Sequence, residues 1–289
     1  MNRGKWINMV EIERVFIMNH SECATLRTKL QELGFRLCNS EIQFAYYMDF
    51  RDFQLFKSKR DFRFRYVFDD QKQFRYTEIS MSVRTYTIGK DEMRKQTKLI
   101  LDTPHIANKL IQMLKGAGMI NSFSLYKYRE EYSKSGGKEY QKDLHIEIDG
   151  KIKMSKYPHW YQYFLEDTFQ ICIESDQEEK WDAMDGVMSQ LGLVKDQITT
   201  QNYGERLDYL IQQKGKGERQ LNDIVCPICN WNPYKSGTMD EGMYIIDGTT
   251  YPITINEKEF STLSGVIKEW VEIHCCKNCK VEFEIPSGT

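Results

Sequence analysis

Strict alternation of apolar and polar residues runs through much of the first two hundred positions. In the segment 10–17, Glu11 and Glu13 fall on one face of a predicted strand and the aliphatic and aromatic residues fall on the other, because successive side chains of a strand point to opposite sides. The same period predicts seven more strands, at 43–50, 61–68, 77–88, 93–101, 122–132, 143–149 and 168–174. The pattern therefore predicts a β-rich domain of eight strands.

Helical spacing of apolar residues is rarer. Leu26, Leu30 and Leu33 predict a helix that Ser21 caps and Gly34 ends. Three more helices are predicted from the residue pattern, at 103–116, 176–191 and 203–211. The aromatic stretch 150–166 fits neither period and receives no assignment. We therefore expect an α+β fold in which strands dominate.

The polar faces of the predicted strands carry charge rather than neutral residues. The acids on these faces are Glu11, Glu13, Glu147, Asp149 and Glu174, and the bases are Arg63, Arg65, Arg84, Arg94, Lys98, Lys127 and Arg129. A closed barrel would gather them in a wet lumen, whereas an open sheet would show them to bulk water.

Paired bases at alternate positions, such as Arg63 with Arg65, destabilise a strand unless an anion offsets their repulsion. Arginine forms hydrogen bonds to phosphate oxygens, and carboxylates bind a divalent metal such as Mg²⁺ or Mn²⁺. We expect a lumen that binds polyphosphate with metal. The alternative is a solvated face on which the charges only increase solubility.

Composition narrows the class of protein. The chain has 289 residues and a formal net charge of −2, which argues against a general nucleic-acid or membrane-surface binder. The sequence has no apolar run of about 18 residues and no apolar stretch at its N-terminus. A cytoplasmic location is therefore expected.

The order of these charged motifs resembles the CYTH family, the triphosphate tunnel metalloenzymes. Glu11-Ile12-Glu13 is similar to the family's opening Glu-x-Glu motif, and Arg63-Phe64-Arg65, Ser82-Val83-Arg84, Lys127-Tyr128-Arg129 and Ile173-Glu174 resemble later motifs in the right order. The resemblance covers residues from about 8 to 211. It implies an eight-stranded antiparallel β-barrel flanked by helices, with Glu11, Glu13 and Glu174 as ligands of a catalytic metal, joined by Glu147 or Asp149.

The chain departs from the family pattern at several positions. Val15 stands where the opening motif has lysine, Gln96 and Lys98 stand where a later strand has two acids, and Cys172 replaces a glutamate of the late pair. We hypothesise that Lys98 supplies the ammonium missing at Val15. The lost acids put a second metal site in doubt.

Two Cys-x-x-Cys units near the C-terminus predict a second module. Cys226, Cys229, Cys276 and Cys279 have the spacing of a closed four-thiolate zinc site. We expect a tunnel domain at 1–211, a linker at 212–222 and a zinc-ribbon-like domain at 223–289 whose zinc is structural. A protein or nucleic-acid partner for this module is an open alternative.

The predicted function is a metal-dependent phosphohydrolase acting on inorganic tripolyphosphate, a nucleoside triphosphate or an RNA 5′-triphosphate. Two alternatives are a tunnel that binds nucleotide or polyphosphate without cleaving it, favoured by the lost acids, and an enzyme similar to class IV adenylyl cyclases. A further alternative is a zinc-dependent interaction protein with an inert barrel.

Overall fold

The computed structural model describes residues 4–86, 92–134, 144–156, 159–165, 167–176 and 180–214, and six short strand segments between 238 and 286. Side chains are described up to residue 209, outside the segment 156–164 and a few single positions. Structural statements below concern these residues.

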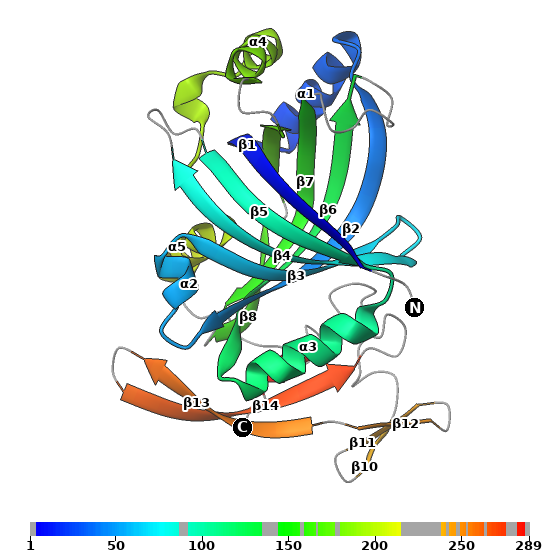
Figure 1. The fold of residues 1–289 in the computed structure, drawn as a ribbon, viewed down its shortest axis with the longest axis vertical. Coiled ribbons are helices and arrows are strands. Elements are labelled where there is room, and N and C mark those ends of the chain that lie inside the picture. Colours follow the sequence, from blue (N-terminus) through cyan, green and yellow to red (C-terminus); the bar gives the residue numbers. More distant parts are fainter. Residues whose placement is uncertain are drawn as a thin grey trace.

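An antiparallel barrel dominates the described part of the chain (Figure 1). Its strands are β1 (Lys5–Asn19), β2 (Arg36–Phe50), β3 (Arg60–Phe68), β4 (Phe74–Tyr86), β5 (Glu92–Leu101), β6 (Met119–Ser133), β7 (His145–Lys156) and β9 (Thr168–Ser175). They are hydrogen-bonded in the order β6-β2-β3-β4-β5-β1-β9-β7, and a further pairing of β6 with β7 closes the circle. The predicted eight-stranded closed barrel is therefore confirmed.

Closure of the barrel places the two faces of each strand in different surroundings. On β1, Ile12 and Phe16 are fully buried on the outside of the barrel, beneath helices, while Glu11 and Glu13 line its interior. On β3, Phe64 and Phe68 are equally buried on the outside. The period-two pattern of the sequence thus specifies which side chains face the lumen.

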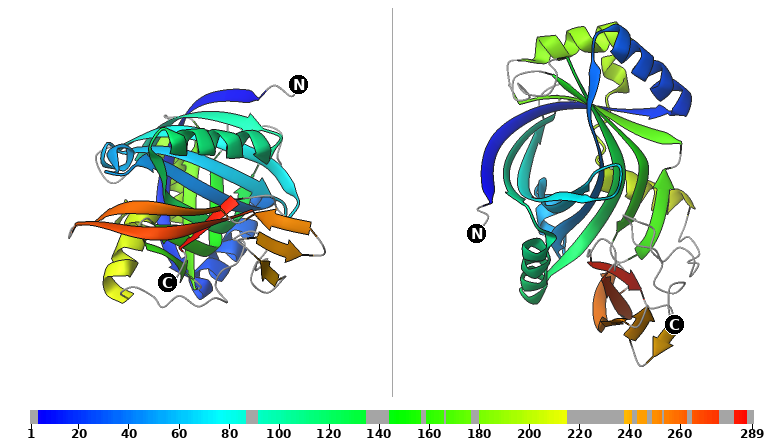
Figure 2. Two further views of the ribbon diagram at one scale, coloured as in Figure 1. Left: turned by 90° about the horizontal axis from the view of Figure 1, so that it is seen from below. Right: turned by 90° about the vertical axis from the view of Figure 1, so that its right-hand side faces the viewer.

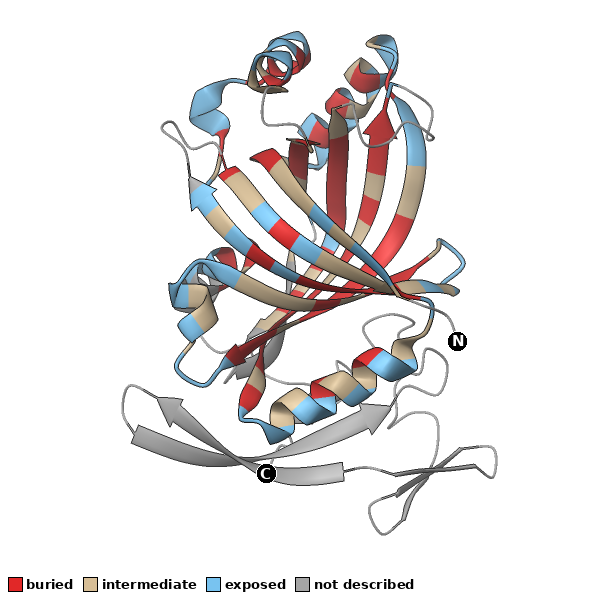
Figure 3. Cartoon of the chain, viewed as in Figure 1, coloured by how far each residue is buried: buried red, intermediate tan, exposed pale blue. Residues whose placement is uncertain are grey.

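Helices cover the barrel at two places (Figure 2). Helices α1 (His20–Glu32) and α4 (Trp181–Leu191) pack on an apolar cluster that includes Ile12, Ile146 and Ile173, and α3 (Pro104–Gly116) packs on one that includes Phe64 and Phe68. The short α2 (Gln54–Lys57) and α5 (Tyr203–Lys214) lie near each other beside one mouth of the barrel. β2 and β6 are buried along most of their length, whereas exposed residues interrupt the buried ones on β5 (Figure 3).

Some local predictions need correction. The first helix is capped by Asn19, whose side chain accepts from the Glu22 backbone N–H while the Glu22 carboxylate accepts from the Asn19 N–H, so Ser21 lies inside the helix. The helix does end at Gly34, which has a φ of +83° that favours glycine. Within the stretch 150–166, which received no assignment, the described residues form strands: β7 continues to Lys156, and β8 (His159–Leu165) pairs with β7.

The C-terminal part contributes two small antiparallel sheets. One consists of β10 (Thr238–Asp240), β11 (Met243–Ile246) and β12 (Thr249–Pro252), and the other of β13 (Thr254–Thr262), β14 (Gly265–Cys275) and β15 (Glu282–Pro286). The four cysteines of the predicted zinc site, Cys226, Cys229, Cys276 and Cys279, lie outside the described residues. Helix α5 continues to Lys214, past the predicted start of the linker at 212.

Among the described residues, every helix is too short or too polar to cross a membrane.

Candidate active site

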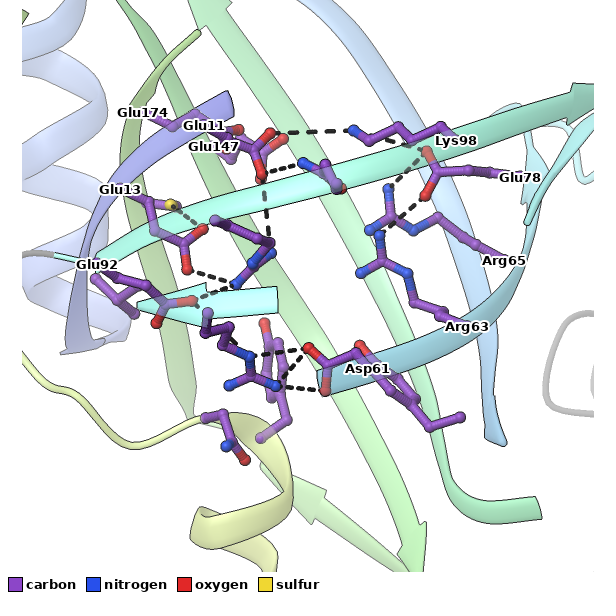
Figure 4. A pocket seen from close by; sticks show the side chains of 18 of the residues that line it. Glu11, Glu13, Asp61, Arg63, Arg65, Glu78, Glu92, Lys98, Glu147 and Glu174 are labelled. Atoms are coloured by element: carbon purple, nitrogen blue, oxygen red, sulfur yellow. Dashed lines mark hydrogen bonds and ion pairs between the residues drawn. The ribbon is translucent and has the colours of Figure 1, made fainter. Parts of the chain in front are cut away.

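A cavity of about 980 Å³ occupies the interior of the barrel. It is lined by all of the charged residues predicted for the site except Asp149: Glu11, Glu13, Arg63, Arg65, Arg84, Arg94, Lys98, Lys127, Arg129, Glu147 and Glu174. Figure 4 shows Glu11, Glu13, Glu147 and Glu174 gathered on one side of this cavity, and Lys98, Arg63 and Arg65 on the other side, where Glu78 and Asp61 also lie. The structure therefore brings these charged residues from seven strands into one cavity.

The carboxylate side is built from β1, β7 and β9. Glu13 pairs directly with Glu174 in the β1–β9 register, and Glu147 pairs with Cys172 in the β7–β9 register. Burial, outweighing the attraction of Arg94, raises the pKa of Glu13 from 4.5 to about 7. Burial and the neighbouring Glu147 and Glu11 raise the pKa of Glu174 well above its ordinary value. Carboxyl groups held this close resist simultaneous ionisation without a cation.

Glu11 behaves differently from its neighbours. Burial opposes its ionisation, but the positive charges of Lys98, Arg94 and Arg63 together outweigh burial and lower its pKa. Its carboxylate lies 4.0 Å from the Lys98 Nζ and accepts a hydrogen bond from the Gln96 amide. Glu11 is thus a charged carboxylate at the boundary between the acidic and basic sides.

The basic side is organised around Glu78 of β4. The Arg63 Nη2 donates to its carboxylate at 2.9 Å, and Arg65 and Lys98 approach it at 3.6 and 3.9 Å. Burial opposes ionisation of Glu78, yet these three cations hold its pKa far below the usual range. Glu78 therefore keeps three positive side chains of the lumen together in the absence of an anion.

Two more arginines connect the sides. Arg94 donates to Glu13 at 2.6 Å and to Glu92 at 2.9 Å. Arg84 forms a bidentate pair with Asp61, with Nε and Nη2 at 2.9 and 2.6 Å from the carboxylate. Arg94 is fixed by one acid of the neighbouring strand β1 and one of its own strand β5, and Arg84 by an acid of the neighbouring strand β3.

Asp149 lies beneath the lumen surface and not on it. Its side chain is 1% exposed and accepts from Lys127 at 2.6 Å, from Arg129 at 2.7 Å and from the Tyr203 hydroxyl at 2.8 Å. Arg129 also contacts Glu147. The structure thus separates Asp149 from Glu147, and Asp149 orients two basic side chains from behind.

Acids outnumber bases in the described lining. Eleven carboxylates and eight arginines or lysines face the cavity. Each of the seven predicted bases has an acid within 4.0 Å. Because burial raises the pKa of Glu13 and of Glu174, this count overstates the negative charge of the wall. An entering polyanion would have to displace internal acids from the bases or bring cations with it.

Three acids of the network were not selected from the sequence. Asp61, Glu78 and Glu92 each lie at an even spacing from a predicted base on the same strand, namely Arg63, Arg84 and Arg94. The period-two rule alone places them on the lumen face.

One group of donor atoms can hold a metal ion. Among the described residues, ligand atoms of Glu13, Cys172 and Glu174 all lie within 4.8 Å of one another, and the Cys172 thiol donates to a Glu13 oxygen at 3.7 Å. Burial and the adjacent Glu13, Glu174 and Glu147 raise the pKa of Cys172 well above its ordinary value. Two carboxylates and a thiol, crowded in a buried position, are a chemically suitable ligand set for a divalent cation.

Comparison with known proteins agrees with this architecture. The CYTH domain model matches residues 9–168. PH1819 from Pyrococcus horikoshii is a similar solved structure, with a TM-score of 0.51 and 15% identity over 69% of this chain and 99% of that one. HpAC1 from Hippeastrum, for which a dominant triphosphatase activity is described, has a TM-score of 0.44 and 13% identity over 73% of this chain and 98% of its own.

No curated protein sequence matches the chain. The similarity to PH1819 supports the fold alone, whereas the family model spans more than half of the sequence. The family match over residues 9–168, together with the closed eight-stranded barrel and its charged lumen, shows that the chain belongs to the CYTH family.

Proposed function

We propose that the protein is a divalent-metal-dependent phosphohydrolase that acts on a triphosphate-bearing substrate. One observation carries this proposal. The carboxylates of the acidic side lie across the barrel cavity from Arg63, Arg65 and Lys98. Family membership supports the same reading, because CYTH enzymes depend on divalent metals.

The basic side would bind the substrate. Arg63, Arg65 and Lys98 share Glu78 in the free protein, and phosphate oxygens would replace that carboxylate as their partner. Guanidinium groups bind phosphate with two parallel hydrogen bonds. Lys127 and Arg129, oriented by Asp149, extend the basic surface.

The acidic side would hold the metal, through Glu11, Glu13 and Glu174 with Glu147 beside them. When bound, a divalent cation would supply charge neutralisation at the phosphoryl group that is attacked by water. The closed wall of the barrel would limit access of bulk water, which strengthens the electrostatic contacts of the chain's own residues.

A binding-only tunnel is the second candidate, and one observation favours it. Every predicted base already has an internal acidic partner, so the lumen is neutralised without substrate. Gln96 and Lys98 also stand where the family pattern has acids. Such a tunnel would bind triphosphate with metal and release no product.

The test measures phosphate, pyrophosphate and cyclic nucleotide release from tripolyphosphate, ATP and 5′-triphosphate RNA. Each substrate is offered with Mg²⁺, with Mn²⁺ and with chelator, using wild type, Glu11→Gln and the control Glu130→Gln, whose carboxylate pairs with Arg27 outside the cavity. We expect metal-dependent release that Glu11→Gln abolishes and Glu130→Gln retains. A triphosphate-induced rise in melting temperature without release would instead support the binding tunnel, and a cyclic product would support the cyclase.

A further inference from the structure

Cys172 is the one cysteine in the described lining of the cavity. We propose that it makes the tunnel cation a thiophilic one, so that Glu13, Cys172 and Glu174 bind Zn²⁺ in preference to Mg²⁺. This inference rests on the proposed function only in placing a cation within the lumen.

The register of the barrel places the three donors together. Glu13 faces Glu174 across the β1–β9 ladder, and Cys172 precedes Glu174 by two residues on the same face of β9. The Cys172 Sγ and a Glu13 oxygen are 3.7 Å apart. Two ligands of one tetrahedral zinc ion, with ordinary Zn–S and Zn–O bonds, lie about 3.6 Å apart. An ion could therefore take the place of the thiol proton with little movement of these two atoms.

The chemistry of the donors decides between cations. Mg²⁺ demands oxygen ligands in near-ideal octahedral geometry, whereas thiolate favours softer ions such as Zn²⁺ and Co²⁺. Cys172 stands at the position that resembles the first glutamate of the family's late Glu-x-Glu pair, so a soft donor occupies a place where the resemblance implies a hard one. The sequence-based expectation of Mg²⁺ or Mn²⁺ took no account of this sulfur.

The surroundings of Cys172 distinguish it from a packing cysteine. Cys23 is equally buried, and it belongs to the apolar cluster beneath α1. Cys172 belongs to none of the three apolar clusters formed by the described residues; it lines the cavity and is 4% exposed. The charged groups that act on it are three carboxylates, Glu13, Glu174 and Glu147, and one guanidinium, that of Arg129. A thiol surrounded by carboxylates gains little from packing and much from a shared cation.

The experiment compares wild type, Cys172→Ser, Cys172→Glu and the control Cys38→Ser, all as full-length protein. Cys38 is an exposed free cysteine on β2. Co²⁺ is titrated as a probe while the thiolate-to-cobalt absorption is recorded, and Mn²⁺ affinity is measured separately by electron paramagnetic resonance. The C-terminal cysteines are unchanged in all four proteins, so their contribution cancels in difference spectra.

We expect Cys172→Ser to lose part of the charge-transfer absorption and to bind Co²⁺ about tenfold more weakly, which corresponds to about 1.4 kcal/mol. Its Mn²⁺ affinity should change little, Cys172→Glu should favour Mn²⁺, and Cys38→Ser should match wild type. Identical spectra in wild type and Cys172→Ser would overturn the proposal, as would equal losses of Co²⁺ and Mn²⁺ affinity. Phosphate release is measured separately on the same proteins. Thiolate-to-cobalt absorption without phosphate release would contradict only the proposed function. Phosphate release without this absorption would contradict only the choice of cation.

Discussion

Glu78 is the residue whose removal tests the electrostatic description of the lumen most directly. Its carboxylate is 6% exposed and lies 2.9 Å from Arg63, 3.6 Å from Arg65 and 3.9 Å from Lys98. The substitution Glu78→Gln keeps the shape of the side chain and removes its charge. Three buried cations then lose their shared partner.

The expected magnitude follows from these distances. A pair at 2.9 Å in a medium of effective dielectric about 20 attracts with about 6 kcal/mol. Desolvation offsets much of this gross attraction, and removing one partner from a buried pair destabilises a protein by about 3–5 kcal/mol. We expect Glu78→Gln to lower the free energy of unfolding by about 3 kcal/mol, since glutamine still accepts one hydrogen bond.

The same change should strengthen anion binding. In chelator, tripolyphosphate no longer competes with the Glu78 carboxylate, so its affinity should rise about tenfold, or about 1.4 kcal/mol. Urea unfolding and calorimetric titration measure the two effects. The control Glu130→Gln removes a carboxylate that pairs with Arg27 at 2.8 Å outside the lumen and should leave anion affinity unchanged. If Glu78→Gln binds tripolyphosphate no better than wild type, these three cations do not form the anion site.

Lys98→Ala should weaken tripolyphosphate binding about tenfold, measured by calorimetry, and unchanged affinity would refute the idea that Lys98 replaces the ammonium missing at Val15. The stability of the metal-free protein should fall as the pH rises from about 5 to 7. In the folded state the pKa of Glu13 is about 7 against an ordinary 4.5, so over this range the folded state binds more protons than the unfolded state. Melting curves with and without Mn²⁺ check this, and a metal-free melting temperature that rises over this range would contradict it. Tyr203→Phe removes a 2.8 Å hydrogen bond to Asp149 and should cost about 1.5 kcal/mol in urea unfolding at unchanged m-value; no loss would show that Asp149 does not depend on this hydroxyl.

Much of the barrel could be predicted because its strands obey a period of two. The eight segments selected from alternation correspond to the eight strands that close the barrel, and Thr103-Pro104 marks the start of α3 as expected. The strands within 150–166 were not predicted, because the aromatic residues of this stretch do not alternate with polar ones. Helix α1 was found, but its cap was misplaced by two residues because both Asn19 and Ser21 are good capping residues.

The site was harder to predict than the strands. Alternation assigns a side chain to the lumen but does not say which residue it meets there, since cross-barrel contacts depend on strand order and register. The enclosure of Asp149 by Tyr203 arises only when α5 docks against β7. The contact of Cys172 with Glu13 joins residues 159 positions apart. Such contacts become visible only in three dimensions.

The closing pairs of the barrel also bear on how the chain reaches its folded state. β1 pairs with β5 on one edge, but its other edge hydrogen-bonds to β9 and must wait for a partner about 150 residues later in synthesis. Contacts between such distant segments are slow to form, because the intervening chain must be ordered first. Glu13 on β1 and Glu174 on β9 meet only at this seam. The proposed cation could therefore bind only late in folding. Its binding rate during refolding would measure how fast the barrel closes.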